Sequence, residues 1–513
     1  MGLGTILIRA DASPEIGTGH AMRCLALAQA WSDQGGRAVF AMVESTSAIR
    51  ERIAAEHFEV VEIAAAAGSS QDSESLRRYA EEQHASWIVL DGYRFDAEYH
   101  QGVREGPSKV LSIDDDGRCS EFGSDLILNQ NVTASPAMYA GRAESRLLLG
   151  PRYALLRREF VVLRGHNRTI PPSAKSALVT LGGNTQVDVA QAVLAALAKT
   201  ELPEMTVTFV VGGSSPFLNF VQPTTGCPRV TFARNPPNMA ELMASADIAI
   251  SASGSTCWEL CFLGVPSLLI DVAPNQRPIA RALDAGGYAI HAGAGGHVSE
   301  KKLSDQFREL AMSQELRGHL SERCLGLVDG RGARRVVSAL RAEQLLFRRA
   351  VSSDAEILWI WSNEPDVRKA SLSSNPIGWG EHQAWFRARF ADPGSLILIA
   401  EEAGEPIGTV RLQAEEAAGA RISLTVAPGA RGLGLAARLI EEGMERAASV
   451  FGVGEVEALV KPWNHASRRS FENAGFRVAS SPDSSGPSFI RYVRETLQAP
   501  AGNSVATAAR RRA

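Results

Sequence analysis

The chain has 513 residues, 45% hydrophobic and 21% charged, so it exceeds one hydrophobic core and roughly two to four domains are expected. Its net charge is −4 and no basic run precedes Arg510–Arg512, which argues against binding to nucleic acid or to a membrane surface. No apolar run could span a membrane, no signal peptide is recognisable and the six cysteines lack CxxC spacing, so we expect a cytoplasmic protein with reduced thiols.

The first predicted elements are a strand at Thr5–Ile8 and a helix at Ala21–Trp31. The turn between them contains Gly17, Thr18, Gly19 and His20. A glycine pair after a strand lets backbone N–H groups approach a ligand, and the start of a helix favours an anion. Histidine ordinarily titrates closer to neutral pH than other side chains, so His20 is a candidate for proton transfer.

Three other interpretations of this turn stay open on spacing alone. A dinucleotide fingerprint fits Gly17, Gly19 and the acid Glu44, but Met22 stands at its third glycine position. His20 and Cys24 have the spacing of two metal ligands on a helix, with no further ligands to complete a site. His20 could also be purely structural.

The signature RADAS–IG–GH–MRCL–LA resembles the opening of the UDP-sugar hydrolases of pseudaminic acid biosynthesis. Those enzymes release UDP from UDP-2,4-diacetamido-2,4,6-trideoxy-β-L-altropyranose and have the two-domain GT-B fold. The resemblance implies that His20 is the catalytic base or positions the water. It also implies that the substrate-binding residues of the signature are Arg9, Asp11, Gly17 and Gly19.

Strand-like and helix-like segments alternate over residues 1–165 and predict βαβ units with a parallel sheet. The predicted strands are Ala38–Val43, Trp87–Leu90, Lys109–Ile113 and Leu126–Leu128, and Ser75–His84 is a predicted helix. Ligands of such sheets bind at the carboxyl ends of strands. Tyr93 follows one strand in a strand–Asp–x–Tyr segment similar to that of the hydrolases, whose tyrosine lies in the sugar pocket, and the resemblance makes Tyr93 a candidate catalytic residue beside His20. Asp114–Asp116 follows another and is interpreted as a solvated acidic turn.

A polar stretch at Arg164–Ser176 predicts a linker, after which a second alternating block begins. Its predicted elements are strands at Ala177–Leu181, Val207–Val211, Ile248–Ser251 and Ser267–Ile270 and helices at Val187–Lys199, Met239–Ser245 (capped by Asn238) and Cys257–Leu263. The small hydroxyl-rich turn before the last helix suits a diphosphate, because N–H groups, hydroxyls and the helix dipole all favour an anion. Its candidate binding residues are Ser253, Gly254, Ser255 and Thr256.

The same block resembles the UDP site of GT-B nucleotide-sugar enzymes. The resemblance implies that Glu259 accepts hydrogen bonds from the ribose hydroxyls. It also implies that Asn275 and Gln276 lie beside the sugar and nucleotide. Cys257 and Cys261 share one helix face and are interpreted as packing residues.

After a predicted helix at Gly332–Arg348, the pattern resembles the GNAT acetyltransferases. A predicted hairpin, Leu396–Glu401 and Pro406–Gln413 around Gly404, is followed by a strand and an R-x-x-G-x-A turn. The resemblance implies that this turn holds the pyrophosphate of acetyl-CoA and that the N-x-x-S segment meets the pantetheine arm. The implied cofactor-binding residues are Val426, Arg431, Gly432, Gly434, Ala436, Asn464 and Ser467.

One position departs from the GNAT pattern, since Phe471 stands where many members have a tyrosine that protonates the thiolate of CoA. Glu364 and His382 are candidate bases, although we expect both to lie on a solvated face. The segment WSNEPDVRKAS with the following PI–EH–WF is similar to the subgroup that acetylates the 4-amino group of the UDP-linked pseudaminic acid precursor.

The predicted fold class is α/β, with two Rossmann-like GT-B domains at 1–165 and 172–340, a mixed α/β GNAT domain at 346–496 and a disordered tail at 497–513. We expect a bifunctional enzyme that N-acetylates a UDP-linked 4-amino sugar with acetyl-CoA and then hydrolyses the product with inversion, without a metal. The alternatives are a UDP-sugar glycosyltransferase with a fused acetyltransferase, and a sensor that binds both ligands without turnover.

Overall fold

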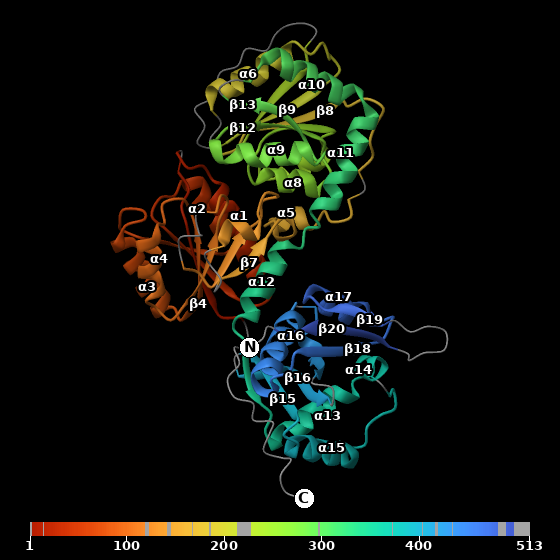
Figure 1. The fold of residues 1–513 in the computed structure, drawn as a ribbon. Coiled ribbons are helices and arrows are strands. Elements are labelled where there is room, and N and C mark those ends of the chain that lie inside the picture. Colours follow the sequence, from red (N-terminus) through yellow and green to blue (C-terminus); the bar gives the residue numbers. More distant parts are fainter. Residues whose placement is uncertain are drawn as a thin grey trace, which may run out of the picture. The chain divides into compact units, whose positions relative to one another are not determined.

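The computed structural model describes residues 3–13, 15–117, 123–140, 145–166, 168–183, 186–212, 227–295, 298–371, 373–402, 404–415, 419–432, 434–480 and 489–496 (Figure 1). The tail predicted at 497–513 lies outside these residues. The chain divides into two compact units, Gly2–Val337 and Ser338–Ala513, which are described separately. The predicted domain boundaries stay predictions.

The first sheet is fully parallel, and its strand order is β3-β2-β1-β4-β5-β6-β7. Its strands are β1 (Thr5–Ala10), β2 (Arg37–Met42), β3 (Glu59–Glu62), β4 (Ala85–Asp91), β5 (Lys109–Ile113), β6 (Leu126–Asn129) and β7 (Arg146–Leu149). Its helices are α1 (Gly19–Ser32), α2 (Ser47–Ala54), α3 (Ser70–Glu82), α4 (Ala97–Arg104) and α5 (Arg158–Val161), with 3₁₀ turns at Pro136–Tyr139 and Pro151–Tyr153.

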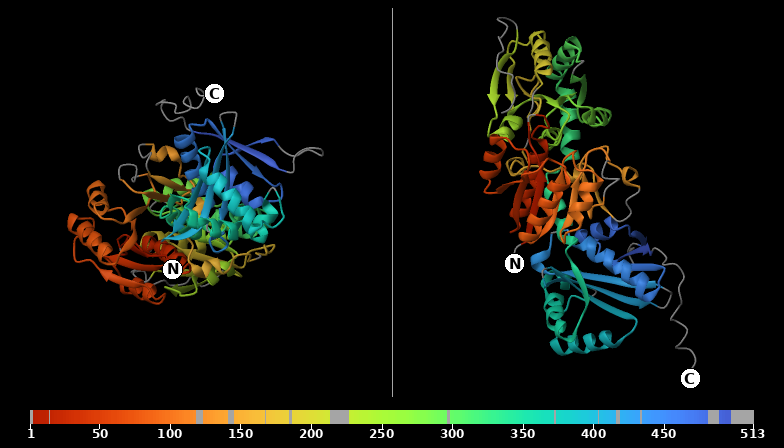
Figure 2. Two further views of the ribbon diagram at one scale, coloured as in Figure 1. Left: turned by 90° about the horizontal axis from the view of Figure 1, so that it is seen from below. Right: turned by 90° about the vertical axis from the view of Figure 1, so that its left-hand side faces the viewer.

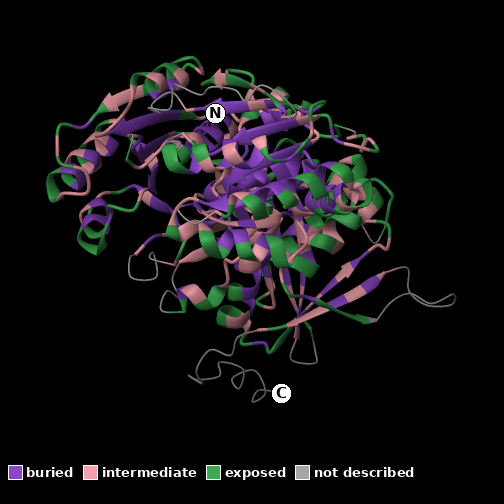
Figure 3. Cartoon of the chain, turned by 90° about the horizontal axis from the view of Figure 1, so that it is seen from above, coloured by how far each residue is buried: buried purple, intermediate pink, exposed green. Residues whose placement is uncertain are grey.

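The chain builds the sheet outward from β1 through β2 to β3, and then crosses back to place β4 on the other side of β1. The strand order therefore reverses between β1 and β4. Because parallel crossovers are right-handed, α1 and α2 cover one face of the sheet and α3 and α4 the other (Figures 1 and 2). Side chains of α3 and α4, such as Leu76 and Tyr99, pack against Leu7 and Ile88 in one buried cluster. Since both faces are covered, the central strands are almost continuously buried (Figure 3).

The second sheet repeats this pattern with the parallel order β10-β9-β8-β11-β12-β13. Its strands are β8 (Ser176–Thr180), β9 (Thr206–Val211), β10 (Arg229–Arg234), β11 (Ile248–Ala252), β12 (Ser267–Asp271) and β13 (Ile290–Ala294). Its helices are α6 (Val187–Ala198), α7 (Met239–Ser245), α8 (Thr256–Phe262), α9 (Arg277–Ala285), α10 (Glu300–Met312) and α11 (Gln314–Leu327), with a 3₁₀ turn at Pro274–Gln276. Helix α12 (Gly332–Ala342) follows them.

The second unit contains a mainly antiparallel sheet with the order β14-β15-β16-β17-β18-β20-β19. Its strands are β14 (Leu346–Arg349), β15 (Ser395–Glu402), β16 (Glu405–Glu415), β17 (Gly419–Val426), β18 (Glu455–Val460), β19 (Arg477–Ser480) and β20 (Ile490–Glu495). Its helices are α13 (Ala355–Asn363), α14 (Pro365–Ala370), α15 (Trp379–Ala391), α16 (Ala436–Arg446) and α17 (His465–Asn473), with short turns at Ser352–Asp354, Pro428–Ala430 and Ala447–Phe451.

Strands β17 and β18 are the parallel pair of this sheet. They pair only from Gly419 to Arg421, so their carboxyl ends separate. Val426 at the end of β17 and the residues after β18 therefore border a gap in the hydrogen-bonded sheet.

The predicted α/β class with two Rossmann-like sheets and a third mixed module is confirmed, and most predicted elements are correct within two residues. Two predictions were wrong. The helix expected to reach Arg348 ends at Ala342, because Leu346–Arg349 pairs as an edge strand with β15. Asn238 stands at the N-cap position before α7, but its side chain makes no capping hydrogen bond and donates instead to Glu241.

No helix within the described parts of the chain is long and apolar enough to cross a membrane.

Candidate functional site

The topology brings the predicted catalytic residues together at the reversal point of the first sheet. The loop after β1 leads into α1 with His20 in its first turn, and Asp91 ends the neighbouring β4. Ligands of open parallel sheets bind outside the carboxyl ends of the strands at this kind of point. A small pocket there is lined by Asp11, Ile16, His20, Asp91, Gly92, Tyr93, Arg94 and Phe95.

His20 is almost buried and is oriented by Asp91. Its Nδ1 lies 2.6 Å from the Asp91 Oδ1, and Nε2 has no partner among the described residues. An ionised carboxylate at this distance favours the tautomer with the proton on Nδ1. The lone pair of Nε2 is then available to accept a proton at the pocket.

Arg23 and Asp115 complete a buried charge cluster that the sequence analysis did not assign to the site. Arg23, one turn after His20 on α1, contacts Asp91 at 2.7 Å through both Nε and Nη2. It also donates to Asp115 at 2.8 and 3.0 Å. Burial alone would raise the pKa of Asp91, but Arg23 and His20 more than offset this and hold it well below its usual range.

The interpretation of Asp114–Asp116 as a solvated turn was wrong for two of its residues. Asp114 is buried and accepts hydrogen bonds from the Tyr139 hydroxyl and the Gly117 N–H. Asp115 faces Arg23, and its pKa is lowered because the pairing with Arg23 outweighs burial. Only Asp116 is exposed. The strands β5 and β6 place the acidic turn beside buried donors, which its composition does not reveal.

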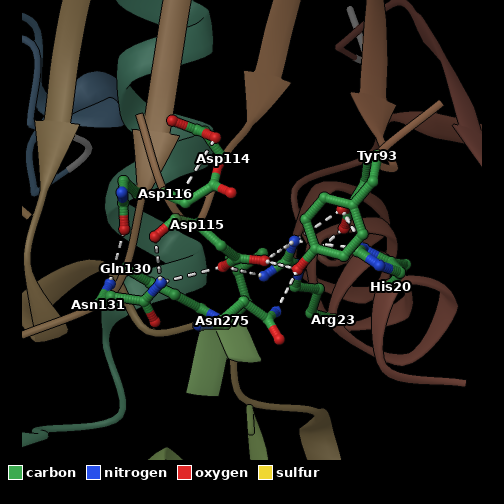
Figure 4. Close-up of polar contacts among 12 residues, drawn as sticks. His20, Arg23, Tyr93, Asp114, Asp115, Asp116, Gln130, Asn131 and Asn275 are labelled. Atoms are coloured by element: carbon green, nitrogen blue, oxygen red, sulfur yellow. Dashed lines mark hydrogen bonds and ion pairs between the residues drawn. The ribbon is translucent and has the colours of Figure 1, made fainter. Parts of the chain in front are cut away.

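Tyr93 joins the charge cluster to the second sheet (Figure 4). Its ring meets the His20 ring edge-on at a centroid distance of 4.9 Å. Its hydroxyl donates to Asp115 at 2.8 Å and accepts from the Asn275 amide at 2.8 Å. Burial and the Asp115 carboxylate raise the pKa of Tyr93 well above its ordinary value.

The hydroxyl-rich turn predicted to bind diphosphate lies at the reversal point of the second sheet, between β11 and α8. Ser253 is fully buried, and its Oγ has no partner among the described residues. A Cβ on Gly19 would meet the Ser255 Oγ at 3.8 Å, and one on Gly254 would lie 3.5 Å from the Gln276 amide nitrogen. The two predicted ligand turns therefore face each other within this unit, with Thr256 as the first residue of α8.

Glu259 and Gln276 both have protein partners. Glu259 pairs with Arg157 at 2.9 Å, and its pKa is raised because burial outweighs this pairing. The Gln276 side-chain oxygen accepts from the Val272 N–H at 3.2 Å. Cys257 and Cys261 are buried, as predicted for packing residues.

Arg9 and Asp11 form a second buried network. Arg9 is fully buried and donates to both oxygens of Asp72, at 3.0 and 2.8 Å, and to Asp11 at 2.6 Å. Asp11 also accepts from the N–H groups of Val43 and Glu44. Arg9 thus holds the loop after β1, whereas Asp11 lines the pocket. Gly17 has φ of +77°, a conformation that favours glycine.

In the second unit, the predicted pyrophosphate turn joins β17 to α16. Gly432 and Gly434 have φ of +74° and +78°, and Ala436 is the first residue of α16. Arg431 donates to the carbonyl of Val426 at 3.2 Å and to Glu364 at 2.8 Å. The side chain of Arg431 therefore fixes the turn to the end of β17.

Asn464 caps the N-terminus of α17, where its side chain accepts from the N–H of Ser467 at 3.1 Å. Phe471 is buried against Phe476 and Tyr492. The expected solvated face for His382 was wrong, because this residue is buried and its Nε2 lies 2.8 Å from the Ala355 carbonyl oxygen. Glu364 caps α14 by accepting from the N–H of Val367 and is held by Arg431.

Among the described residues, no three histidine, cysteine, aspartate or glutamate side chains are grouped closely enough to hold a metal ion.

The chain therefore consists of a unit with two parallel α/β sheets and a unit with a mainly antiparallel sheet, and comparisons with known proteins show what each part is similar to. Residues 344–477 match the family model of the acetyltransferase (GNAT) domain. Residues 176–313 match that of the glycosyltransferase family 28 C-terminal domain. Together the two models cover separate parts of the chain, which supports a fusion.

Two curated relatives are matched over almost their whole length. The chain is 24% identical to UDP-2,4-diacetamido-2,4,6-trideoxy-beta-L-altropyranose hydrolase of Campylobacter jejuni, over 56% of this chain and 98% of the relative. It is 26% identical to the spore coat polysaccharide biosynthesis protein SpsG of Bacillus subtilis, over 65% of this chain and 97% of that protein. The predicted resemblances to the hydrolases and to the GNAT acetyltransferases are thereby confirmed.

A third relative, protein MJ1062 of Methanocaldococcus jannaschii, is 21% identical over 416 residues, which is 77% of this chain and 80% of the relative. This alignment is longer than Gly2–Val337 and so extends into both units. Among solved structures, spermidine N-acetyltransferase of Vibrio cholerae is 18% identical over 30% of this chain and 96% of that protein, with a TM-score of 0.28.

Replacing Arg9 should destabilise the first unit, because Arg9→Met leaves Asp72 and Asp11 buried without their cation. We expect a loss of about 3–5 kcal/mol, seen as a lowered melting temperature in calorimetry. Arg50→Met is the control, since Arg50 pairs with Glu62 on the surface and its loss should change stability little. Equal melting temperatures for wild type and Arg9→Met would contradict this role.

Proposed function

We propose that the chain is a bifunctional enzyme of nucleotide-sugar metabolism. The GNAT unit transfers an acetyl group from acetyl-CoA to the 4-amino group of a UDP-linked 4-amino-4,6-dideoxy sugar. The first unit then hydrolyses the UDP-2,4-diacetamido-2,4,6-trideoxy sugar to free sugar and UDP. A cytoplasmic location is part of the same proposal.

The observation that carries the hydrolase assignment is the His20–Asp91 pair opposite the Ser253–Thr256 turn. Asp91 leaves the Nε2 of His20 as a proton acceptor at the pocket, the geometry that a general base requires. The turn offers the buried hydroxyl of Ser253, which has no hydrogen-bond partner among the described residues, and the start of α8, and both favour phosphate oxygens. We infer that UDP binds at the second sheet and that the sugar lies toward His20.

In this arrangement His20 would take a proton from water as its oxygen attacks the anomeric carbon. The C–O bond to the diphosphate breaks, and UDP leaves with the bonding electrons. Attack from the face opposite the leaving group inverts the anomeric centre, and no covalent nucleophile is needed. The proposed contacts of UDP are the Ser253–Thr256 turn and Glu259 for the ribose hydroxyls, with Asn275 and Gln276 beside the sugar.

The acetyltransferase assignment is supported by the GNAT match and by the gap between β17 and β18. The positive-φ glycines after β17 allow backbone N–H groups to turn toward a pyrophosphate, as in other anion-binding nests. We propose that acetyl-CoA binds along Val426 and this turn, with Asn464 and Ser467 near its pantetheine arm. The neutral amine attacks the thioester carbonyl and loses a proton to a base or to water, and CoA leaves as a thiolate. Phe471 cannot protonate it, so another group or water does.

A UDP-sugar glycosyltransferase is the second candidate, because residues 176–313 match a glycosyltransferase C-terminal domain. The two functions differ in the nucleophile. Incubation of the protein with the UDP-4-amino sugar and acetyl-CoA, followed by mass detection, should reveal the acetylated UDP-sugar and then free diacetamido sugar and UDP. UDP release only after an acceptor is added would favour the transferase, and the absence of both products would refute both activities.

Replacing His20 should abolish hydrolysis with little effect on binding. His20→Asn removes the base, and we expect kcat to fall by about 10²–10⁴-fold. In ¹⁸O-labelled water, the wild-type protein should place the label in the new hydroxyl of the sugar. His57→Asn is the control, because His57 is exposed and its positive φ suits asparagine. Label in UDP, or full activity of His20→Asn, would refute the mechanism.

Glu259→Ala should weaken UDP binding, since the ribose hydroxyls would lose a charged acceptor worth about 1.5–3 kcal/mol. Glu159→Ala is a matched control, because Glu159 also contacts Arg157, at 2.7 Å, but does not lie on α8. Calorimetric titration with UDP measures both. Equal affinities in the two variants would leave Glu259 as a partner of Arg157 only.

Gly434→Val should raise the KM for acetyl-CoA about tenfold or more, because a side chain there obstructs the N–H groups of the proposed phosphate turn. Its Cβ would also meet Ser338 at 3.0 Å. Gly404→Val has nearly the same φ, +80°, with open space around its Cβ, and so controls for backbone strain. An unchanged KM for acetyl-CoA in Gly434→Val would exclude this turn from the site.

A further inference from the structure

A continuous chain of polar contacts runs from His20 to the second sheet (Figure 4). It passes from the His20 ring to Asp91, then through Arg23 to Asp115, and from there through the Tyr93 hydroxyl to Asn275. In each of these contacts the two polar atoms lie 3.0 Å apart or less. Its members come from α1, the ends of β4 and β5, and the 3₁₀ turn after β12.

Arg23 occupies the centre of this chain. Its Nη2 lies 2.7 Å from the Asp91 Oδ1, 3.0 Å from the Asp115 Oδ2 and 3.3 Å from the His20 Nδ1. The side chains of Arg23 and Asp91 are 6% and 0% exposed, so water screens these charges poorly. A cation so close to the imidazole opposes its protonation, whereas the two carboxylates favour it.

Asp115 fixes the proton of Tyr93. The hydroxyl of Tyr93 has one proton, and it points to the Asp115 carboxylate, while the Asn275 amide donates to the hydroxyl oxygen. With these two hydrogen bonds, the hydroxyl proton of Tyr93 is used in the hydrogen bond to Asp115. Tyr93 is therefore unsuited to donate a proton to the leaving group, although it was a catalytic candidate on sequence. Its ring instead contacts His20 and the pocket.

Asn131 holds Asp115 from the other side. Its amide donates to the Asp115 carboxylate at 3.0 Å and to the Asp115 carbonyl oxygen at 3.2 Å. Asn131 is itself buried, and its N–H donates to the Asn129 side chain. The Asp115 carboxylate is thus fixed by Arg23, Tyr93 and Asn131 together.

We propose that Arg23 and Asp115 are positioning residues that set the protonation of His20 and the orientation of Tyr93 through opposing charges. The proposal rests on the proposed hydrolase function for its consequence in catalysis. Arg23 keeps Asp91 ionised and opposes the imidazolium form, and Asp115 balances Arg23. Arg23 and Asp115 thereby act on the imidazole with opposite charges, while the contact of Nδ1 with Asp91 leaves Nε2 toward the pocket.

The potential at the His20 imidazole depends on the charged and titratable groups that surround it on neighbouring elements. These groups are Arg23 and Cys24 on α1, Asp91 at the end of β4, Tyr93 and Arg94 after β4, Asp115 after β5 and Asp11 after β1. Removing one charge from this set changes the potential at the imidazole in a defined direction.

The two positioning residues should act on His20 in opposite directions. Arg23→Gln removes a cation, so the pKa of His20 should rise and the acidic limb of the kcat/KM profile should move to higher pH. Asp115→Asn removes an anion, so both should move to lower pH. We expect shifts of about one pH unit. Histidine ring NMR of the full chain, assigned with His20→Asn, measures the titration without substrate.

Two further variants separate charge from structure. Arg23→Lys keeps the cation and should retain the His20 titration of the wild type. It should lose the bidentate hydrogen bond to Asp91 and part of kcat. Asp116→Asn removes an exposed charge from the same turn and should leave the titration and activity unchanged. Circular dichroism monitors folding, and if Arg23→Gln does not fold, the Asp115→Asn and Asp116→Asn pair still tests the proposal.

Shifts in the same direction for Arg23→Gln and Asp115→Asn, or no shift in Asp115→Asn, would overturn the positioning role. A wild-type protein that releases no UDP would instead refute the proposed function, and the NMR titrations would still decide whether Arg23 and Asp115 control His20. The two failures are thus distinguishable.

Discussion

The ion pairing of Asp91 with Arg23 is the interaction on which the arrangement of the first site depends. Asp91 is fully buried at the end of a central strand, where an unpaired carboxylate would be strongly disfavoured. Arg23 supplies two hydrogen bonds to it, and the lowered pKa of Asp91 shows that pairing outweighs burial. The ionised carboxylate consequently stabilises the fold above the ordinary carboxylate range, about pH 4, and this contribution is lost as the pH falls below it.

This pairing stands where the topology makes a site available. In both parallel sheets the strand order reverses between the first strand and the fourth, at β1 and β4 and at β8 and β11. Two loops diverge at each reversal, so side chains and N–H groups are exposed there instead of being covered by a crossover. The first reversal carries His20, the second carries the hydroxyl-rich turn, and the close approach of Gly19 to Ser255 shows that they face each other.

The sequence was most informative where a local pattern determines the structure. Buried parallel strands are continuous apolar runs, so Lys109–Ile113 and its neighbours could be found with errors of one or two residues. Gly17 and Gly434 were recognisable because a turn needs their conformation. Asp115 was misjudged because three successive aspartates look like a solvated turn, and its burial depends on Arg23, 92 residues away. Arg23 itself gave only the weak signal of standing one helical turn after His20.

The proposed phosphate sites show how one physical requirement is met by two unrelated sheets. In the first unit the turn is followed by a short helix and relies on hydroxyl side chains, with Ser253 buried and lacking a described partner. In the second unit glycines with positive φ leave the backbone N–H groups accessible, and Arg431 fixes the turn to its strand. Each turn follows a strand whose carboxyl end is not covered by a neighbouring connection. In the first unit the strand order reverses there, and in the second unit β17 separates from β18. An anion can therefore approach the start of a helix in both units, although no sheet topology is shared between them.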